Sequence, residues 1–231
     1  MNIKDTVKIY YVNSIEKNQL KINGKGNHPL WKQTKSITNF KSPWDSEKIK
    51  PIDFKALCDS ETLFFCFKVE DQDIHIDTTD NTNRSINESD RVELFFRTDE
   101  LLNPYYCLEI DAKSRIMDFK AKPDKQFDFN WNWPKEDIEA KSAIESTCFT
   151  VEIAISLASL TKLGLLKEGK IETGIYRAKY NKQVNGNFES TWITWVDPET
   201  ETPNFHIASS FGILKLENFD FHAFPSLVGI L

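Results

Sequence analysis

Residues 89–97 carry the pattern that most restricts the fold of this chain. Side chains in a β-strand alternate between the two faces of the sheet. One face of this segment therefore carries Val92, Leu94 and Phe96, and the other carries Arg91, Glu93, Phe95 and Arg97. The pattern predicts an antiparallel sheet with one core face and one polar face, because such a sheet needs only one face buried. We expect functional residues on the side of Glu93.

The rest of the chain repeats short strand-like segments and offers one convincing helix, at residues 156–165 with Ser156 as its cap. About ten such segments, separated by turn signals every eight to twelve residues or so, predict an all-β fold. We expect a two-sheet antiparallel β-sandwich, either jelly-roll or immunoglobulin-like, with one short helix. A doubly wound α/β fold is excluded because helices do not alternate with the strands.

The expected strands also define a core and a domain. With 231 residues and 40% hydrophobic residues, the chain suits one sandwich over residues 1–217, followed by a tail, 218–231, that the sequence does not place. The predicted core consists of Val92, Leu94, Phe96, Phe65, Phe67, Leu108, Val151 and Ile153.

The charge and hydropathy of the chain restrict the classes of partner that it can bind. A net charge of −6 opposes a nucleic-acid surface, which needs clustered Lys and Arg. No apolar run is long enough to cross a membrane, and the first residues lack the apolar stretch of a signal peptide. We therefore expect no nucleic-acid or membrane partner and a monomer, and the localisation stays open.

The four cysteines, at 58, 66, 107 and 148, each lie within a strand-like run, and none forms a C-x-x-C pair. The pattern predicts buried, reduced thiols.

Residues 70–88 are predicted to form a long polar loop, a kind of segment that often carries function. If the loop is extended, Asp71, Asp73, His75 and Asp77 share one face. Carboxylate oxygens are calcium ligands, so a calcium site that uses Asp71 and Asp73 is one hypothesis. A solvated loop without metal is the simpler alternative.

Aromatic residues gather in a second segment, 122–137, where Phe127, Phe129, Trp131 and Trp133 alternate with polar residues. The segment is predicted to be either an aromatic loop that stacks on a ligand or an edge strand that covers the sheet. The sequence favours neither alternative.

Several stretches together resemble carbohydrate-binding module family 9 and its DOMON-like relatives. The resemblance covers residues 7 to 217 and rests on Ile22-Asn23-Gly24, Trp31, Val69-Glu70-Asp71, Asp90 to Phe96, Tyr105 to Asp111, Val151 to Ile155, Trp192 to Trp195, Phe205-His206 and Phe211-Gly212. It implies a β-sandwich that binds sugars without cleaving them, often at a reducing end and often with structural calcium. Members of the family are mostly extracellular or periplasmic.

The resemblance also assigns roles to individual residues. Glu93 stands where the family has a strand carboxylate that binds sugar hydroxyls. The two positions of the aromatic clamp hold Asn87 and Phe205, and the positions of an arginine and an amide on the next strand hold Cys107 and Glu109. With Asn87 at one clamp position, the clamp is expected to be one-sided.

The predicted ligand is an oligosaccharide or polysaccharide on the polar face and loop end of the sandwich. Carboxylates accept hydrogen bonds from hydroxyls, and aromatic faces cover the apolar side of a sugar ring. The expected acidic surface consists of Glu93, Glu109 and Glu152. The residues predicted to contact the ligand are Glu93, Glu109, Asn87, Tyr176, Trp192, Phe205 and His206. The alternative is a solvated face whose carboxylates pair with arginine and lysine.

Two other functions compete with sugar binding. Glu93 and Glu109 have the residue types of a glycoside hydrolase, xylanase-like or otherwise, although short connections leave little room for the cleft that raises a catalytic pKa. A haem-binding DOMON-like domain would use Met117 or a histidine at 28, 75, 206 or 222 as axial ligand. No nucleophile paired with a base is evident, so we predict a non-catalytic protein.

Overall fold

The computed structural model describes residues 7–46 and 48–217, so the tail at 218–231 lies outside the described residues. Two short helices are present, α1 (Asn83–Asn87) and α2 (Leu157–Lys162), with single 3₁₀ turns at Pro29–Lys32, Lys135–Asp137 and Ala208–Ser210. The strands are β1 (Ile9–Ser14), β2 (Ile52–Cys58), β3 (Thr62–Glu70), β4 (Arg91–Arg97), β5 (Tyr105–Asp111), β6 (Ile116–Lys122), β7 (Gln126–Asp128), β8 (Ile138–Ile144), β9 (Cys148–Ser156), β10 (Leu166–Lys167), β11 (Lys170–Lys182), β12 (Phe188–Thr194) and β13 (Gly212–Leu216).

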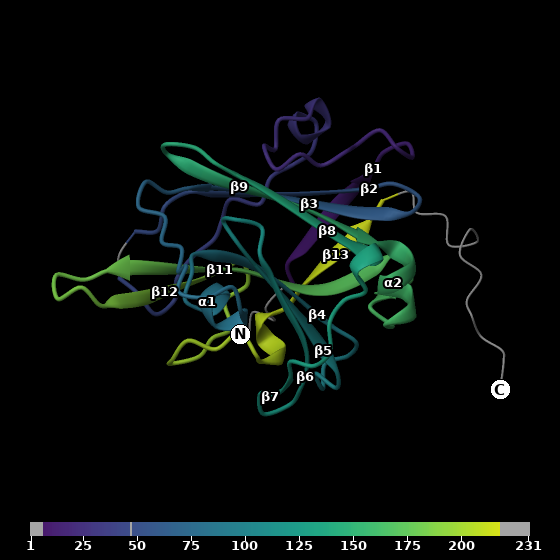
Figure 1. Cartoon of the computed structure of the whole chain (residues 1–231). Coiled ribbons are helices and arrows are strands. Elements are labelled where there is room, and N and C mark those ends of the chain that lie inside the picture. The colour runs from purple at the N-terminus through teal and green to yellow at the C-terminus, as the bar shows by residue number, and fades with distance from the viewer. Residues whose placement is uncertain (1–6, 47, 218–231) are drawn as a thin grey trace, which may run out of the picture.

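The strands follow one curled path in the order β7-β6-β5-β4-β11-β13-β1-β2-β3-β9-β8, with β10 and β12 also paired to β11. Strand β1 joins the two layers, because residues 9–12 pair with β13 and residues 13–14 pair with β2. In Figure 1 the layer with β2, β3, β8 and β9 lies over the layer with β4, β5 and β11. The all-β sandwich is confirmed, but it is not purely antiparallel, since both pairings of β1 are parallel.

The main core lies between the two layers. It contains all eight residues predicted from alternation, with Val92, Leu94 and Phe96 facing Phe65 and its neighbours. Phe96 is fully buried and its ring centroid lies 6.3 Å from that of Phe65. Burial of these side chains supplies the apolar contribution that holds the layers together.

Helix assignments from sequence were partly right. Helix α2 begins as predicted, with the Ser156 hydroxyl accepting a hydrogen bond from the Ser159 amide at 3.0 Å. The prediction of a single helix was wrong, because α1 forms within the polar segment 70–88, where Thr82 caps it by accepting from the Arg84 amide. None of the described helices is long and apolar enough to cross a membrane.

The second face of β4 and β5 is covered by other elements, so the alternative of a solvated polar face is wrong. Phe95, Tyr105, Cys107 and Tyr176 belong to a second apolar cluster on this face. Helix α1 contacts β5 and β6 there, and Phe205 and Phe211 pack into the same cluster. Elements from three distant parts of the chain therefore enclose the side of the sheet that carries Glu93.

Glu152 does not join an acidic surface, which corrects the prediction. It lies on β9 in the other layer, where its carboxylate accepts hydrogen bonds from the amides of Asn23 and Gly24 and from the Trp31 indole. Gly24 has φ +83°, and a Cβ there would meet the backbone of Ser142 at 2.7 Å. The Ile22-Asn23-Gly24 and Trp31 motif is thus a structural attachment of the first loop to β9.

All four cysteines are buried and unpaired, as predicted. The edge-strand alternative holds for part of the aromatic segment after β6, because β7 pairs with β6, while Trp133 is buried in the main core. Phe127 and Phe129 stay 37% and 49% exposed and contact Phe119 of β6.

Candidate functional site

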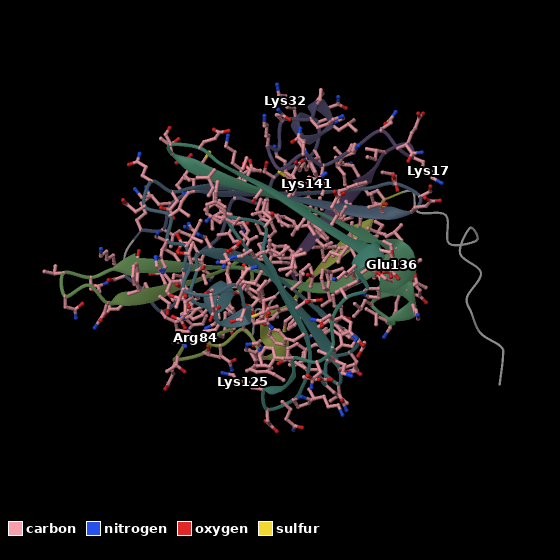
Figure 2. The ribbon with its side chains drawn as sticks, viewed as in Figure 1. Lys17, Lys32, Arg84, Lys125, Glu136 and Lys141 are labelled. Atoms are coloured by element: carbon pink, nitrogen blue, oxygen red, sulfur yellow. The ribbon has the colours of Figure 1, made fainter. Side chains whose placement is uncertain are left out.

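A cavity of about 480 Å³ lies over the covered face of β4, β5 and β6. Strand β12, helix α1, the β6–β7 segment and the loop before β13 supply its walls. The residues that line it are Asn83, Arg84, Asn87, Arg91, Glu93, Glu109, Met117, Phe119, Phe127, Phe129, Trp192, Phe205 and His206. Figure 2 shows Arg84 and Lys125 on the side of the molecule away from Lys32 and Lys141.

The floor of this pocket is a pair of carboxylates with one arginine. Glu93 and Glu109 are direct neighbours across β4 and β5, and Arg91 lies two residues before Glu93 on the same face. Like charges placed opposite each other destabilise a sheet unless a cation compensates them. The Arg91 Nε donates to Glu109 Oε2 at 2.6 Å and lies 3.0 Å from Glu93 Oε1.

Burial raises the pKa of both carboxyl groups. Glu93 is 2% exposed, and loss of water together with the nearby Glu109 raises its pKa to about 8, against the opposing effect of Arg91. Burial also raises the pKa of Glu109, and the charge and hydrogen bond of Arg91 oppose this rise. The pair therefore holds a proton near neutral pH, in contrast to the ionised surface that the sequence suggested.

Glu93 also has an unused hydrogen-bonding atom. Its Oε1 is buried and has no hydrogen-bond partner among the described residues, since the Arg91 Nε proton is directed to Glu109. Leaving a buried acceptor unpaired costs about 1–3 kcal/mol. An acceptor in this position on a cavity floor is suited to a hydroxyl group of a ligand.

Arg91 is held in place from several sides. Its Nη1 donates to the Asn87 carbonyl at 2.5 Å, and the guanidinium lies 5.6 Å from the Trp192 ring centroid. The Tyr180 hydroxyl donates to the same carbonyl at 2.6 Å. Asn87, predicted as a clamp residue, therefore both lines the pocket and positions the arginine at its floor.

Aromatic rings form the walls. Phe205 stacks on Tyr176 with centroids 4.1 Å apart and an interplanar angle of 8°, and Trp192 meets Phe205 edge-on at 5.8 Å. Tyr176 was predicted to touch the ligand, but it is fully buried beneath Phe205 and its hydroxyl lies 2.7 Å from Ser210 Oγ. Its role in this arrangement is to support the Phe205 ring.

His206 stands beside these rings as a neutral group. Its Nδ1 lies 3.0 Å from the Tyr105 hydroxyl, and its ring contacts those of Phe95 and Phe127 at 5.0 Å each. Burial lowers the pKa of His206 to about 4, with a further lowering from Lys125. If Tyr105 donates to Nδ1, the ring proton stays on Nε2, where it is a donor.

The structure thus brings six of the seven predicted ligand-binding residues to one cavity and places Tyr176 behind it. Sequence reasoning missed Met117, Phe119 and Arg84 as lining residues, whereas it offered ligand stacking by Phe127 and Phe129 as one of two alternatives. The alternation of Phe127 and Phe129 with polar residues was the available signal. Aromatic rings reach the cavity from two separate segments, and the one-sided clamp of Phe205 opposite Asn87 stays a prediction.

The two residues proposed for calcium have other partners. Asp71 is 5% exposed, forms an ion pair with Arg177 and lies 3.1 Å from Lys179. Asp73 donates its amide to Asp71 Oδ1 at 2.9 Å. Within residues 7–46 and 48–217, no three His, Cys, Asp or Glu side chains gather in a way that could hold a metal ion. Arg177 and Lys179 already neutralise the Asp71 carboxylate, and the calcium site stays a prediction.

The chain matches the model of a known family. A family model described as "Carbohydrate family 9 binding domain-like" matches residues 22–219. No curated protein matches the chain. A protein of Bacteroides uniformis for which carbohydrate binding has been proposed has a similar structure, with a TM-score of 0.69 at 14% identity over 92% of this chain and 100% of its own.

Two structures of a carbohydrate-binding module of family 9 from Caldicellulosiruptor kristjanssonii are also similar. The complex with glucose has a TM-score of 0.61 at 16% identity and covers 93% of this chain and 98% of its own. The complex with cellotriose has a TM-score of 0.61 at 17% identity and covers 97% of this chain and 100% of its own. At these identities the likeness shows a shared fold.

Proposed function

The chain belongs to the carbohydrate family 9 binding domain-like family, and we propose that it binds a short neutral glycan in the pocket floored by Glu93 and Glu109. The observation that carries this proposal is Glu93 Oε1 at the floor of an aromatic-walled cavity, which lies 3.0 Å from Arg91 Nε but receives no hydrogen bond from the described residues. Sugar rings combine hydroxyl donors with apolar faces, which is the combination that such a cavity complements.

The binding groups divide into two sets. Glu93 and Glu109 accept hydrogen bonds from hydroxyls, while Arg91 keeps the two carboxyl groups oriented. Trp192, Phe205 and Phe127 offer ring faces or edges to the apolar side of a sugar. His206, in its neutral form, adds one donor or acceptor at the cavity wall.

A cavity of about 480 Å³ limits the ligand to a few sugar units at a time. The related modules from Caldicellulosiruptor kristjanssonii were solved with glucose and cellotriose, so cello-oligosaccharides are the first ligands to test. We expect a dissociation constant of about 10 μM to 1 mM, which corresponds to about −4 to −7 kcal/mol.

Calorimetric titration with cellotriose tests the proposal. Replacing Glu93 by Ala removes the floor acceptor and is expected to weaken binding by about tenfold or more, because leaving a buried ligand hydroxyl without its hydrogen bond costs about 1–3 kcal/mol. Glu100→Ala, on an exposed turn, is the matched control. Trp192→Ala tests the aromatic wall.

Phe205 contributes to folding as well as to the pocket. It is 5% exposed and stacks on Tyr176, so its truncation removes core packing as well as a ligand contact. We expect Phe205→Ala to lose about 3–5 kcal/mol of folding stability, in addition to affinity. The melting temperature of that variant is therefore expected to fall.

Hydrolysis is the second candidate function, and one observation favours testing it. The pocket raises the pKa of Glu93 to about 8, chiefly through burial, and a general acid at neutral pH needs a carboxyl group of that kind. The same titration samples are therefore assayed for new reducing ends. Binding without release supports a binding module, and release abolished by Glu93→Gln establishes a hydrolase.

A further inference from the structure

A second cavity, of about 670 Å³, opens where β11 and β12 meet the segments 48–50 and 71–75. It shares no lining residue with the candidate pocket. The alternation along β11 explains the separation. Tyr176 packs under the candidate pocket, whereas Arg177 and Lys179 line the second cavity.

The second cavity concentrates positive charge in a chain whose net charge is −6. Five cations line it, namely Lys48, Lys50, Arg177, Lys179 and Lys182, against the carboxylates of Asp71 and Asp73. Among those five, Arg177 and Lys179 form ion pairs with Asp71 and with the buried Asp90. Lys48, Lys50 and Lys182 are exposed and have no ion pair with a described carboxylate.

Arg177 adds an unpaired donor. Its side chain is almost completely buried, its Nη2 donates to Asp71, and its Nε has no hydrogen-bond partner among the described residues. A buried donor without an acceptor costs free energy, and an oxyanion is a group that can provide such an acceptor. Arginine is also the side chain best suited to a planar carboxylate.

One wall of this cavity is aromatic. His75 and Phe188 stack with ring centroids 3.7 Å apart, and Phe188 is 39% exposed. Ile74 and Ile49 lie on the same lining and pack against the main core. A stacked pair next to a group of cations offers a surface to a ring and a charge to its substituent.

We propose that this cavity is a second binding site, and that it takes an acidic sugar, a uronic acid unit whose ring lies on Phe188 and His75 and whose carboxylate meets the cations. This site is separate from the pocket of the proposed function and takes a different ligand. The proposal stands on charge, an unpaired arginine donor and an aromatic wall at one place.

Calorimetric titration with digalacturonic acid tests the proposed uronic acid site. Cellobiose is the comparison ligand, because it is a neutral disaccharide of equal size. Replacing Lys48, Lys50 and Lys182 together by Gln is expected to weaken digalacturonate binding by roughly tenfold, the combined effect of three modest charge interactions. The control replaces Lys21, Lys25 and Lys32 by Gln, which removes the same charge from exposed positions outside both cavities. We expect the control to bind like the parent.

Two further arms locate the ligand. Phe188→Ala is expected to weaken digalacturonate binding, and acetate is expected to bind far more weakly than the disaccharide, since both changes remove the ring contact. Glu93→Ala is expected to bind digalacturonate like the parent and to bind cellotriose more weakly. The two binding sites can therefore be disrupted separately. Equal weakening in the two lysine triple variants, or loss of digalacturonate binding in Glu93→Ala, would overturn the proposal.

Discussion

Replacing Glu93 by Gln tests the electrostatics of the pocket floor through protein stability. In the folded state the pKa of Glu93 is raised from 4.5 to about 8, with burial as the first cause and Glu109 as the second. The folded protein therefore binds a proton that the unfolded chain releases. Stability must fall as the pH rises from about 4.5 to 8, and must level off above that range.

The size of the effect follows from the shift. One pKa unit corresponds to about 1.4 kcal/mol, so the rise from 4.5 to about 8 corresponds to a loss on the order of 5 kcal/mol at high pH. Glutamine has the shape of the protonated acid and does not ionise. We expect the variant to lie within about 1 kcal/mol of the parent at pH 5 and to exceed it by about 2 kcal/mol or more at pH 9, a conservative fraction of the full loss.

Urea unfolding at pH 5, 7 and 9 measures this difference, with Glu100→Gln as a control at an exposed position. Other titrating groups affect parent and variant alike, so the comparison isolates Glu93 and its coupling to Glu109. A parent and a Glu93→Gln variant whose stabilities change in parallel between pH 5 and pH 9 would show that Glu93 is ionised in the folded protein. The account of the pocket floor would then be wrong.

Three other predictions concern the scaffold. Phe96→Ala is expected to cost about 2–5 kcal/mol in urea unfolding because the side chain is fully buried in the main core, and a cost near zero would mean that the faces of β4 are reversed. Glu152→Ala removes the acceptor of three donors, one of them the Trp31 indole, so we expect a loss of about 3 kcal/mol and a changed Trp31 fluorescence. His206 is expected to titrate near pH 4 by NMR because burial disfavours its charged form, and a midpoint near 6.5 would contradict its buried placement.

The sequence predicted the layers of the sandwich well because alternation is a local property. Val92, Leu94 and Phe96 point to the core as the pattern required, and the order of several short motifs, one of which contains Glu93, led to the correct family. Strand β1 was harder to predict, since its parallel pairing with β13 joins residues about 200 positions apart. Nothing in its own sequence indicates those partners.

The sequence predicted most residues of the candidate site but not the elements that cover them. Alternation shows which side of β4 carries Glu93, but it does not show what covers that side. The cover comes from α1 and from the loop that holds Phe205, and this cover turns a charged face into a buried floor. The error with Tyr176 has the same origin, because only the position of Phe205 decides that Tyr176 lies beneath it.

The central claim is that a sugar binds in the pocket and that Glu93 accepts one of its hydroxyl groups. Titration calorimetry with cellotriose at pH 7 on the parent, Glu93→Ala and Glu100→Ala tests it most directly. The account predicts a dissociation constant of about 10 μM to 1 mM for the parent and the control, with binding about tenfold or more weaker in Glu93→Ala. Equal affinity for a confirmed sugar in all three proteins would contradict the claim and leave only the sandwich as the inherited feature of the family.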